Sequence, residues 1–371
     1  MVSLKNYLMH RINAALNAPV VGLDISDRGM KYLRFHEAHG MLYPDAFGRK
    51  EIPEGVIMGG VIMREDELVR VLKEWAAHEG RALATSGFVV SLPEEKSFVR
   101  VIRIPNMKRE EVGNAIRWEL ESNVPFKVDE ISYSYEVVET GSKSADHLDV
   151  VVTAFPKAIV EAYVRVCTGA GLQPTALELE SQAIIRSLAI QREDMAIRVV
   201  LDIGSSRTSI TLVLGRFIIF TATIPLGGVL LEEQIAKGLK VAPTEAIRIK
   251  KTLGLDKRAY DGNLFAALAP SIAALTDEAR RAIEYSGNYT HRLGVPSMLV
   301  VSVLLVGGDA SLPGLDTYLA SALEVVVTRH DPFLPLGSRL LGIVPPLIRT
   351  EALSFATVVG LALRPIDAIL S

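Results

Sequence analysis

The chain has 371 residues, 49% of them hydrophobic, and its 40 Lys and Arg are balanced by 43 Asp and Glu. This near-neutral charge with no basic block argues against a nucleic-acid partner, because duplex binding needs clustered cationic side chains. The single cysteine, Cys167, excludes an intramolecular disulfide and suits a reducing cytosol. No apolar stretch approaches the roughly 20 residues of a membrane-spanning helix, and the N-terminus lacks the apolar core of a signal peptide.

Residues 1–18 are predicted to form an amphipathic helix, since Leu4, Leu8, Ile12 and Leu16 recur at helical spacing. The simpler interpretation is a terminal helix docked on its own domain. The alternative is a peripheral membrane contact, because a moderately basic amphipathic segment can lie at a lipid surface.

A first α/β domain is expected over residues 19–94, with strands from 20 to 49, a helix over 65–79 and a buried strand at 87–93. Residues 95–150 differ in character: alternating strands flank one helix, which predicts a small inserted α+β subdomain. The first domain is expected to resume over residues 151–198.

The second half is expected to repeat this plan over residues 199–371. Strands at 197–225 are followed by a helical insertion over 228–296 and a buried strand that ends at Val306. Helices are predicted at 315–323 and 355–364.

The two halves share a sequence pattern. Leu23-Asp24-Ile25-Ser26 recurs as Leu201-Asp202-Ile203-Gly204, and each unit continues to Ile-Pro-x-Gly, at 52–55 and at 224–227. A strand, a turn and a second strand with an Asp before the turn, present twice, imply two related domains that face each other. An anion could be held in the cleft between them.

Three segments carry the expected chemistry. The turns at 24–29 and 204–208 let successive backbone N–H groups point at one anion, and Asp24 and Asp202 suit a hydrated Mg²⁺. Gly307-Gly308, between a strand and a helix, offers a flat backbone surface for a planar base. Each alone is also typical of an ordinary turn, but together and in this order they predict a nucleotide cleft.

This order of turns is that of the actin-like ATPases, and within them the chain resembles the PilM family of type IV pilus assembly proteins, relatives of the division protein FtsA. The motifs that carry the resemblance are Arg103-Ile104-Pro105-Asn106-Met107, Ile116 to Glu121, Val124-Pro125-Phe126, Tyr133 to Val137, Leu177 to Ala183, Ile224 to Gly228, Asp331-Pro332-Phe333 and Gly360 to Arg364. The resemblance implies an α/β actin-like ATPase fold, with two related ribonuclease-H-like domains around a nucleotide cleft. It also implies a small α+β insertion in the first domain and a helical insertion in the second.

By position, the resemblance implies that ATP and Mg²⁺ occupy the cleft. The implied nucleotide-binding residues are Asp24, Ser26, Asp27 and Lys31 in the first turn, Gly204, Ser205, Ser206 and Thr208 in the second, Gly228 and Lys250 on helices, and Gly307, Gly308 and Ala310 under the adenine. Asp24 and Asp202 are the implied metal ligands. Asp202 or Glu180 would orient a water for hydrolysis.

The resemblance further implies a cytoplasmic protein, peripheral at the inner membrane, that docks the N-terminal cytoplasmic peptide of a PilN-like membrane protein. The residues expected to contact this partner are Ile104, Pro105, Trp118, Val124, Pro125 and Phe126. The alternative is that all of these except Trp118 fill the insertion's own core. Contacts with pilus motor ATPases and self-association stay open.

Two departures from the family pattern predict binding with at most weak ATP hydrolysis. Asp27-Arg28 stands where the family usually has small residues, and a carboxylate beside a triphosphate is unfavourable unless a metal or Arg28 offsets it. Ile247 stands where the family has a Glu that would accept from the ribose, although Glu245 is nearby. Two alternatives remain: an actin-like subunit of a type II secretion or related platform with degenerate nucleotide binding, or a small-molecule kinase of the same superfamily.

Overall fold

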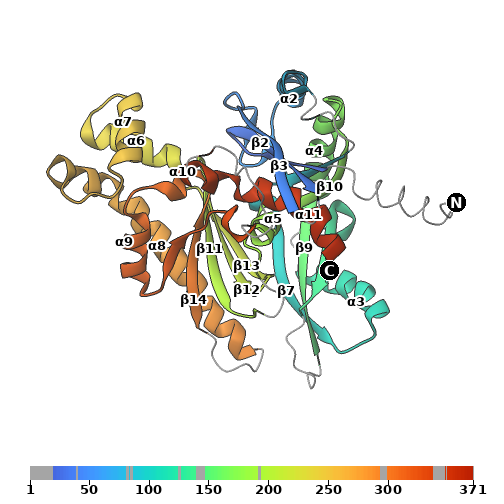
Figure 1. The fold of residues 1–371 in the computed structure, drawn as a ribbon. Coiled ribbons are helices and arrows are strands. Elements are labelled where there is room, and N and C mark those ends of the chain that lie inside the picture. The colour runs from blue at the N-terminus through green and yellow to red at the C-terminus, as the bar shows by residue number, and fades with distance from the viewer. Residues whose placement is uncertain are drawn as a thin grey trace.

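The computed structural model contains two α/β domains, each built on a five-stranded sheet (Figure 1). It describes residues 20–370 except 39–40, 81–82, 84–86, 124–126, 139–146, 191–193, 293–298, 337–346 and 348. The helix expected over residues 1–18 lies outside the described residues.

The sheet of the first domain has the strand order β10-β6-β1-β2-β3. Its strands are β1 (Val20–Ile25), β2 (Gly29–Ala38), β3 (Met41–Glu51), β6 (Gly87–Leu92) and β10 (Pro174–Leu179). β1 pairs antiparallel with β2 and parallel with β6. The side chains of β1 and β6 are buried almost throughout, as expected for central parallel strands that are covered on both faces.

The sheet of the second domain has the order β13-β12-β11-β14-β15, which is the same topology. Its strands are β11 (Ile197–Ile203), β12 (Thr208–Leu214), β13 (Phe217–Ile224), β14 (Val300–Val306) and β15 (Val327–Arg329). Asp24 pairs with Lys31 in the first sheet, and Asp202 pairs with Ser209 at the matching register of the second. The internal repeat predicted from the sequence is therefore confirmed.

The helices of the first domain are α2 (Glu65–Glu79), α4 (Lys157–Gly169), α5 (Glu180–Ser187) and α11 (Ala356–Leu370). The second domain was expected to extend to residue 371, but α11 packs on α5 and β1 of the first domain. Glycines permit this close contact. A Cβ atom at Gly22 would lie 2.6 Å from the Val358 carbonyl oxygen, and one at Gly360 would overlap the backbone of Ala183.

The second domain carries the helical region expected between its third and fourth strands. It consists of α6 (Gly228–Leu239), α7 (Pro243–Thr252), the 3-10 helix η4 (Ala259–Gly262) and α8 (Asn263–Arg292). After β14 follow η5 (Gly308–Ser311), α9 (Leu315–Leu323), η6 (Leu334–Leu336), α10 (Arg349–Ala352) and η7 (Leu353–Phe355). Figure 1 shows α6, α7 and α9 on the side of the molecule away from the first domain, whereas α10 lies next to that domain.

The inserted subdomain follows β6 through the short helix η2 (Glu94–Lys96). It comprises β7 (Phe98–Pro105), α3 (Arg109–Asn123), η3 (Val128–Glu130), β8 (Ile131–Val137) and β9 (His147–Pro156), with the sheet order β7-β9-β8. Pro156 is the N-cap residue of α4. The subdomain has its own hydrophobic core, and its β7 packs against β13 (Figure 1). The insertion therefore contacts both domains.

A small hairpin, β4 (Ile57–Met58) and β5 (Val61–Ile62), turns at Gly59-Gly60 in the first domain.

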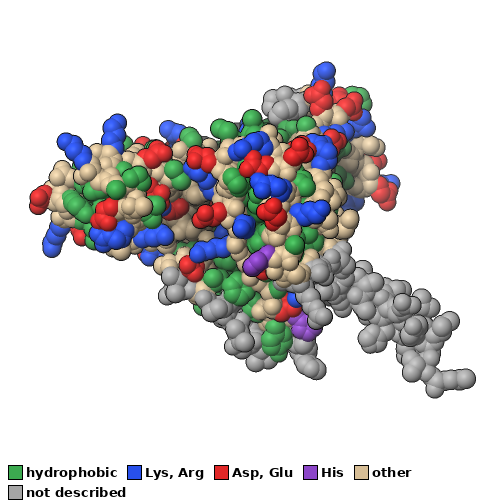
Figure 2. All heavy atoms as spheres, turned by 90° about the horizontal axis from the view of Figure 1, so that it is seen from above, with side chains coloured by type: hydrophobic (Ala, Val, Ile, Leu, Met, Phe, Trp, Pro, Cys, Tyr) green, Lys and Arg blue, Asp and Glu red, His purple; other side chains and the backbone are tan. Residues whose placement is uncertain are grey.

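On the surface of the molecule, acidic and basic side chains are interspersed over the face seen in Figure 2. Within the described ranges, no helix combines the length and the apolar character needed to cross a membrane.

Candidate functional site

The two predicted turns face each other across the boundary between the domains. The Ser206 hydroxyl donates a hydrogen bond to Asp27 Oδ2 at 3.3 Å, and Arg207 Nη1 lies 3.7 Å from Asp27 Oδ1. Residues that are about 180 positions apart in the chain thus meet at one place, as the repeat predicted.

Asp24, at the end of β1, is a buried carboxylate with partners inside its own domain. Its Oδ1 atom accepts a hydrogen bond from Ser91 Oγ at 3.0 Å, and its Oδ2 atom lies 3.6 Å from Lys31 Nζ. Ser91 in turn accepts from the Ile25 amide at 2.9 Å. This carboxylate is therefore fixed in position.

Asp202, the counterpart of Asp24, has different surroundings. Burial and the nearby Asp24 carboxylate raise the pKa of Asp202 to about 6. In the described part of the chain no hydrogen bond or ion pair reaches its carboxylate. Lys31 and Arg207 offset only part of the charge of these two neighbouring carboxylates, since the pKa of Asp202 stays raised. A divalent cation would stabilise the pair, and Mg²⁺ needs only one or two carboxylates beside phosphates and water. The pair therefore fits the metal expected from the sequence, although no group of three or more possible ligands occurs among the described residues.

Arg207 is the central charge between the two turns, and the sequence analysis missed it. Its side chain belongs to the second domain but contacts three carboxylates of the first. Nε lies 2.8 Å from Glu95 Oε2, Nη2 lies 2.9 Å from Glu180 Oε1, and Nη1 approaches Asp27. An Arg in a turn of otherwise small residues was the available signal.

Glu180 begins α5, where the resemblance placed a water-orienting group. Its carboxylate accepts hydrogen bonds from Arg207 and, at 3.4 Å, from the Glu94 amide. Burial raises the pKa of Glu180 to about 8, against the opposing effect of Arg207. In this arrangement Glu180 is engaged by the protein, so it can orient a water only if Arg207 moves.

The first turn departs from expectation in how its charges are offset. Arg28 was considered as the group that would neutralise Asp27, but it pairs at the surface with Glu54 at 3.3 Å. Arg207 of the second domain takes this role. Ser26 closes the turn by donating its hydroxyl to the Gly29 carbonyl at 2.9 Å.

The second turn is tied to the start of α6. The amides of Gly228 and Val229 donate to the carbonyl oxygens of Gly204 and Ser205 at 3.0 and 2.9 Å. The Thr208 hydroxyl donates to Leu226 O at 2.6 Å. The Thr208 side chain thus fixes the turn, while Ser206 points to the first domain.

The Gly307-Gly308 segment lies beside Asp202. Gly307 has a φ of +91°, and a Cβ atom there would meet the Asp202 carboxylate and would lie 2.5 Å from Ile203 O. Gly308 begins η5, and Ala310 is fully buried. The glycine is therefore required by both backbone conformation and space, as a close approach to this edge demands.

The residues expected near the base form ion pairs within the protein. The Lys250 ammonium contacts Asp309 and lies 2.6 Å from Glu232 Oε1. Glu245, considered as a substitute ribose acceptor, instead pairs with Arg248. The structure therefore brings the two turns and Gly307 together but gives Lys250 and Glu245 partners within the protein.

The expected partner residues are distributed unevenly. Trp118 on α3 is 72% exposed and Pro105 is exposed, whereas Ile104 is 1% exposed in the core of the insertion and cannot offer a contact surface. Val124, Pro125 and Phe126 lie outside the described residues. The sequence analysis missed Tyr133 and Tyr135, which are exposed on the edge strand β8.

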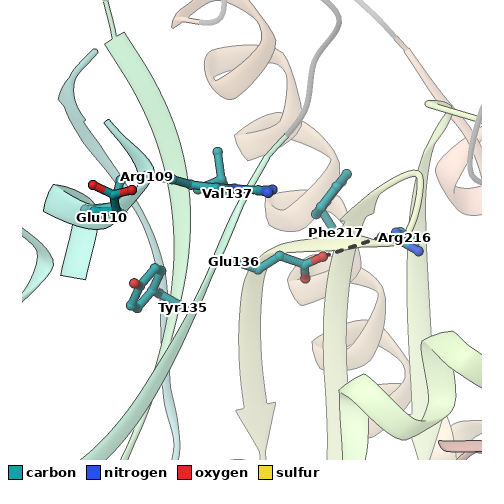
Figure 3. A pocket seen from close by; sticks show the side chains of 8 residues that line it. Arg109, Glu110, Tyr135, Glu136, Val137, Arg216 and Phe217 are labelled. Atoms are coloured by element: carbon teal, nitrogen blue, oxygen red, sulfur yellow. Dashed lines mark ion pairs between the residues drawn. The ribbon is translucent and has the colours of Figure 1, made fainter. Parts of the chain in front are cut away.

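A pocket of about 570 Å³ adjoins this edge strand (Figure 3). It is lined by Arg109, Glu110 and Val112 of α3, by Tyr135, Glu136 and Val137 of β8, and by Arg216 and Phe217 at the start of β13. Arg216 Nη2 lies 3.7 Å from Glu136 Oε1 across it. The hollow lies between the insertion and the second domain.

Two domains of one sheet topology that meet through their first turns define an actin-like protein. MreB 5 of Spiroplasma citri, solved with AMPPNP, is similar in fold, with a TM-score of 0.56 and 12% identity over 95% of this chain and 98% of that chain.

The family model described as type IV pilus assembly protein PilM matches residues 22–366, so this chain belongs to that family. A solved chain of a PilM-PilN type IV pilus biogenesis complex is 25% identical, with a TM-score of 0.75, covering 94% of this chain and 99% of that one. The cell division protein FtsA of Bacillus subtilis (strain 168) is 28% identical over 191 residues, which are 47% of this chain and 43% of FtsA. The chain thus matches less than half the length of that relative.

Proposed function

We propose that this protein is the ATP-binding component of a type IV pilus assembly platform and docks the cytoplasmic tail of a PilN-like inner-membrane protein. Membership of the PilM family supports the pilus role. The single observation that carries nucleotide binding is the meeting of the two turns, with Asp24 and Asp202 close enough to raise the pKa of Asp202. The protein would then be cytoplasmic and would reach the membrane through its partner.

The cleft residues have separable roles in this proposal. Asp24 and Asp202 would hold Mg²⁺, which would offset the charge of the phosphates. The amides of the two turns would receive the phosphates, and Gly307-Gly308 would support the base. Because Arg207 engages Glu180, we expect turnover far below the ~10 s⁻¹ of ordinary enzymes; a rate near that value would favour a kinase or another metabolic ATPase.

Nucleotide binding can be tested with two matched glycine variants. Gly307→Ala places a Cβ atom against Asp202 and Ile203, whereas Gly171→Ala, at a φ of +83°, places one in open space. Both variants carry similar backbone strain, but only Gly307→Ala obstructs the cleft. We expect thermal stabilisation by MgATP to persist in Gly171→Ala and to be lost in folded Gly307→Ala. Equal stabilisation of both variants would refute the assigned cleft.

For the partner we propose the edge of β8 and the pocket beside it. No further strand pairs with β8 among the described residues, so an extended peptide can add to this edge through backbone hydrogen bonds. Side-chain pockets then set its register. The similarity to a chain from a PilM-PilN complex supports a peptide partner.

The test uses a synthetic peptide of the cytoplasmic segment of the PilN-like protein from the same genome. Tyr135→Ala should weaken its binding about tenfold or more. Tyr260→Ala is the control, because Tyr260 is also 42% exposed but lies on the second domain far along the chain from the insertion. Peptide binding that is equally strong in both variants would rule out the β8 edge. If neither the wild type nor either variant binds the peptide, the proposed partner is ruled out.

A further inference from the structure

The carboxylate of Asp27 lies in an anion-binding arrangement built from both domains. The amide of Gly59 donates to Oδ2 at 3.1 Å, and the amide of Gly60 donates to Oδ1 at 3.0 Å. From the second domain, Ser206 Oγ lies at 3.3 Å and Arg207 Nη1 at 3.7 Å. A protein carboxylate thus has four donors around it.

The two amide donors come from a backbone shaped for an anion. Gly59 and Gly60 both have positive φ, +54° and +72°, at the turn of the β4–β5 hairpin, so their successive N–H groups converge. At Gly60 the backbone lies so close to Pro93 that a Cβ atom would overlap it. This donor pair is therefore held rigidly against the base of the insertion.

The other two donors belong to the turn that would receive phosphate. If a base lies on Gly307-Gly308, we expect the phosphates to extend toward the turns and the last phosphate to lie beside Ser206 and Arg207. These are the donors that Asp27 uses. A terminal phosphate and the Asp27 carboxylate therefore compete for the same groups, and they also repel each other.

The remaining charges of the cleft strengthen this competition. Arg207 already contacts Glu95 and Glu180, so it offers little further positive charge to a phosphate while Asp27 is present. The arginine of the first turn, Arg28, is directed to Glu54 at the surface. Lys31, the remaining cation of the first turn, lies 3.6 Å from Asp24 Oδ2. Each of these three cations therefore already has a carboxylate partner within the protein.

We propose that Asp27 is a specificity-determining residue whose carboxylate stands in for the terminal phosphate, holds the two turns together and disfavours a nucleoside triphosphate relative to the diphosphate. This inference rests on the proposed nucleotide cleft. It assigns to Asp27 the discrimination between the two nucleotides, rather than a loss of binding in general.

The test is calorimetric titration of MgATP and MgADP into the full chain with Asp27→Asn and Asp27→Ser. Both substitutions remove the negative charge of Asp27. Asn keeps the shape of the side chain, whereas Ser shortens it. If one variant fails to fold, the other still provides the test. The matched control is Glu54→Gln, which removes one negative charge beside the same turn at the exposed Arg28 pair.

We expect each Asp27 variant to shift the ratio of the two dissociation constants about tenfold or more in favour of MgATP, equivalent to roughly 1.4 kcal/mol. Glu54→Gln should leave the ratio unchanged. A ratio that stays constant, or moves toward MgADP, in nucleotide-binding Asp27 variants overturns this inference alone. Absence of binding in the wild type and in every variant overturns the cleft itself and this inference with it.

Discussion

The two turns occupy equivalent positions in two sheets of the same topology, yet they carry different charges. In the first, Asp24 is fixed by Ser91 and Lys31, and Arg28 points outward to Glu54. In the second, Asp202 is buried near Asp24 and has no hydrogen-bond or ion-pair partner among the described residues, and Arg207 points inward to the first domain. The repeated backbone therefore specifies where the turns meet. The residues at single positions, Arg28 and Arg207, decide which half supplies positive charge to the interior.

The segments after the central parallel strands differ in the same way. β14 is followed by Gly307-Gly308, which lets a ligand approach the backbone closely. β6 is followed by Pro93 and η2, which lead into the insertion and carry the Glu95 that Arg207 contacts. In our proposal the second half supports the base and the first half carries the insertion that binds the partner. Arg207 of the second half contacts Glu95 at the base of that insertion.

The largest expected effect on stability comes from the inward arginine. Arg207→Gln leaves Glu95, Glu180 and Asp27 without their shared cation, and removing one member of a buried ion pair costs about 3–5 kcal/mol. Urea unfolding of the ligand-free chain at pH 8.5 measures this loss. A loss below about 1 kcal/mol would mean that the three carboxylates do not depend on Arg207.

A smaller effect is expected from pH acting on Asp202. Because its pKa is raised from 3.8 to about 6 in the folded chain, the folded state keeps a proton that the unfolded state releases above about pH 4. The free energy of unfolding should therefore fall as pH rises from about 4 to 6, by at most about 3 kcal/mol, and then level off.

The contribution of Asp202 is isolated by comparison with Asp202→Asn in metal-free buffer. The unfolding free energy of the wild type minus that of Asp202→Asn should fall as pH rises from about 4 to 6, because Asn cannot titrate. An identical pH dependence for both chains would show that Asp202 is not buried beside another carboxylate.

The smallest effect is expected at the outward arginine, Arg28. Its ion pair with Glu54 is exposed, and such pairs contribute about 0–1 kcal/mol and weaken with salt. Arg28→Gln should therefore change the urea midpoint little. A loss as large as that of Arg207→Gln would remove the contrast between the two turns.

Much of the local structure was predictable from the sequence. The helix Glu65–Glu79 has the predicted bounds, because hydrophobic periodicity is a local property. The meeting of the two turns was also predictable, since the repeat of Asp24 and Asp202 implied two similar domains.

What could not be predicted depends on contacts between distant segments. The return of α11 to the first domain is determined by the fit of Gly360 against Ala183, and no local pattern reports that fit. Likewise, an Arg at position 207 could point to solvent or inward. Only the fold places three carboxylates of the first domain around it.

The central claim, that both halves build one nucleotide cleft, is tested most directly by calorimetric titration of MgADP into wild type, Asp24→Asn and Asp202→Asn. The account predicts one site per chain that requires Mg²⁺. Each variant should bind about tenfold or more weakly, because each domain supplies one carboxylate to the metal. Binding to both variants with the affinity of the wild type, or no binding to the wild type, would contradict it.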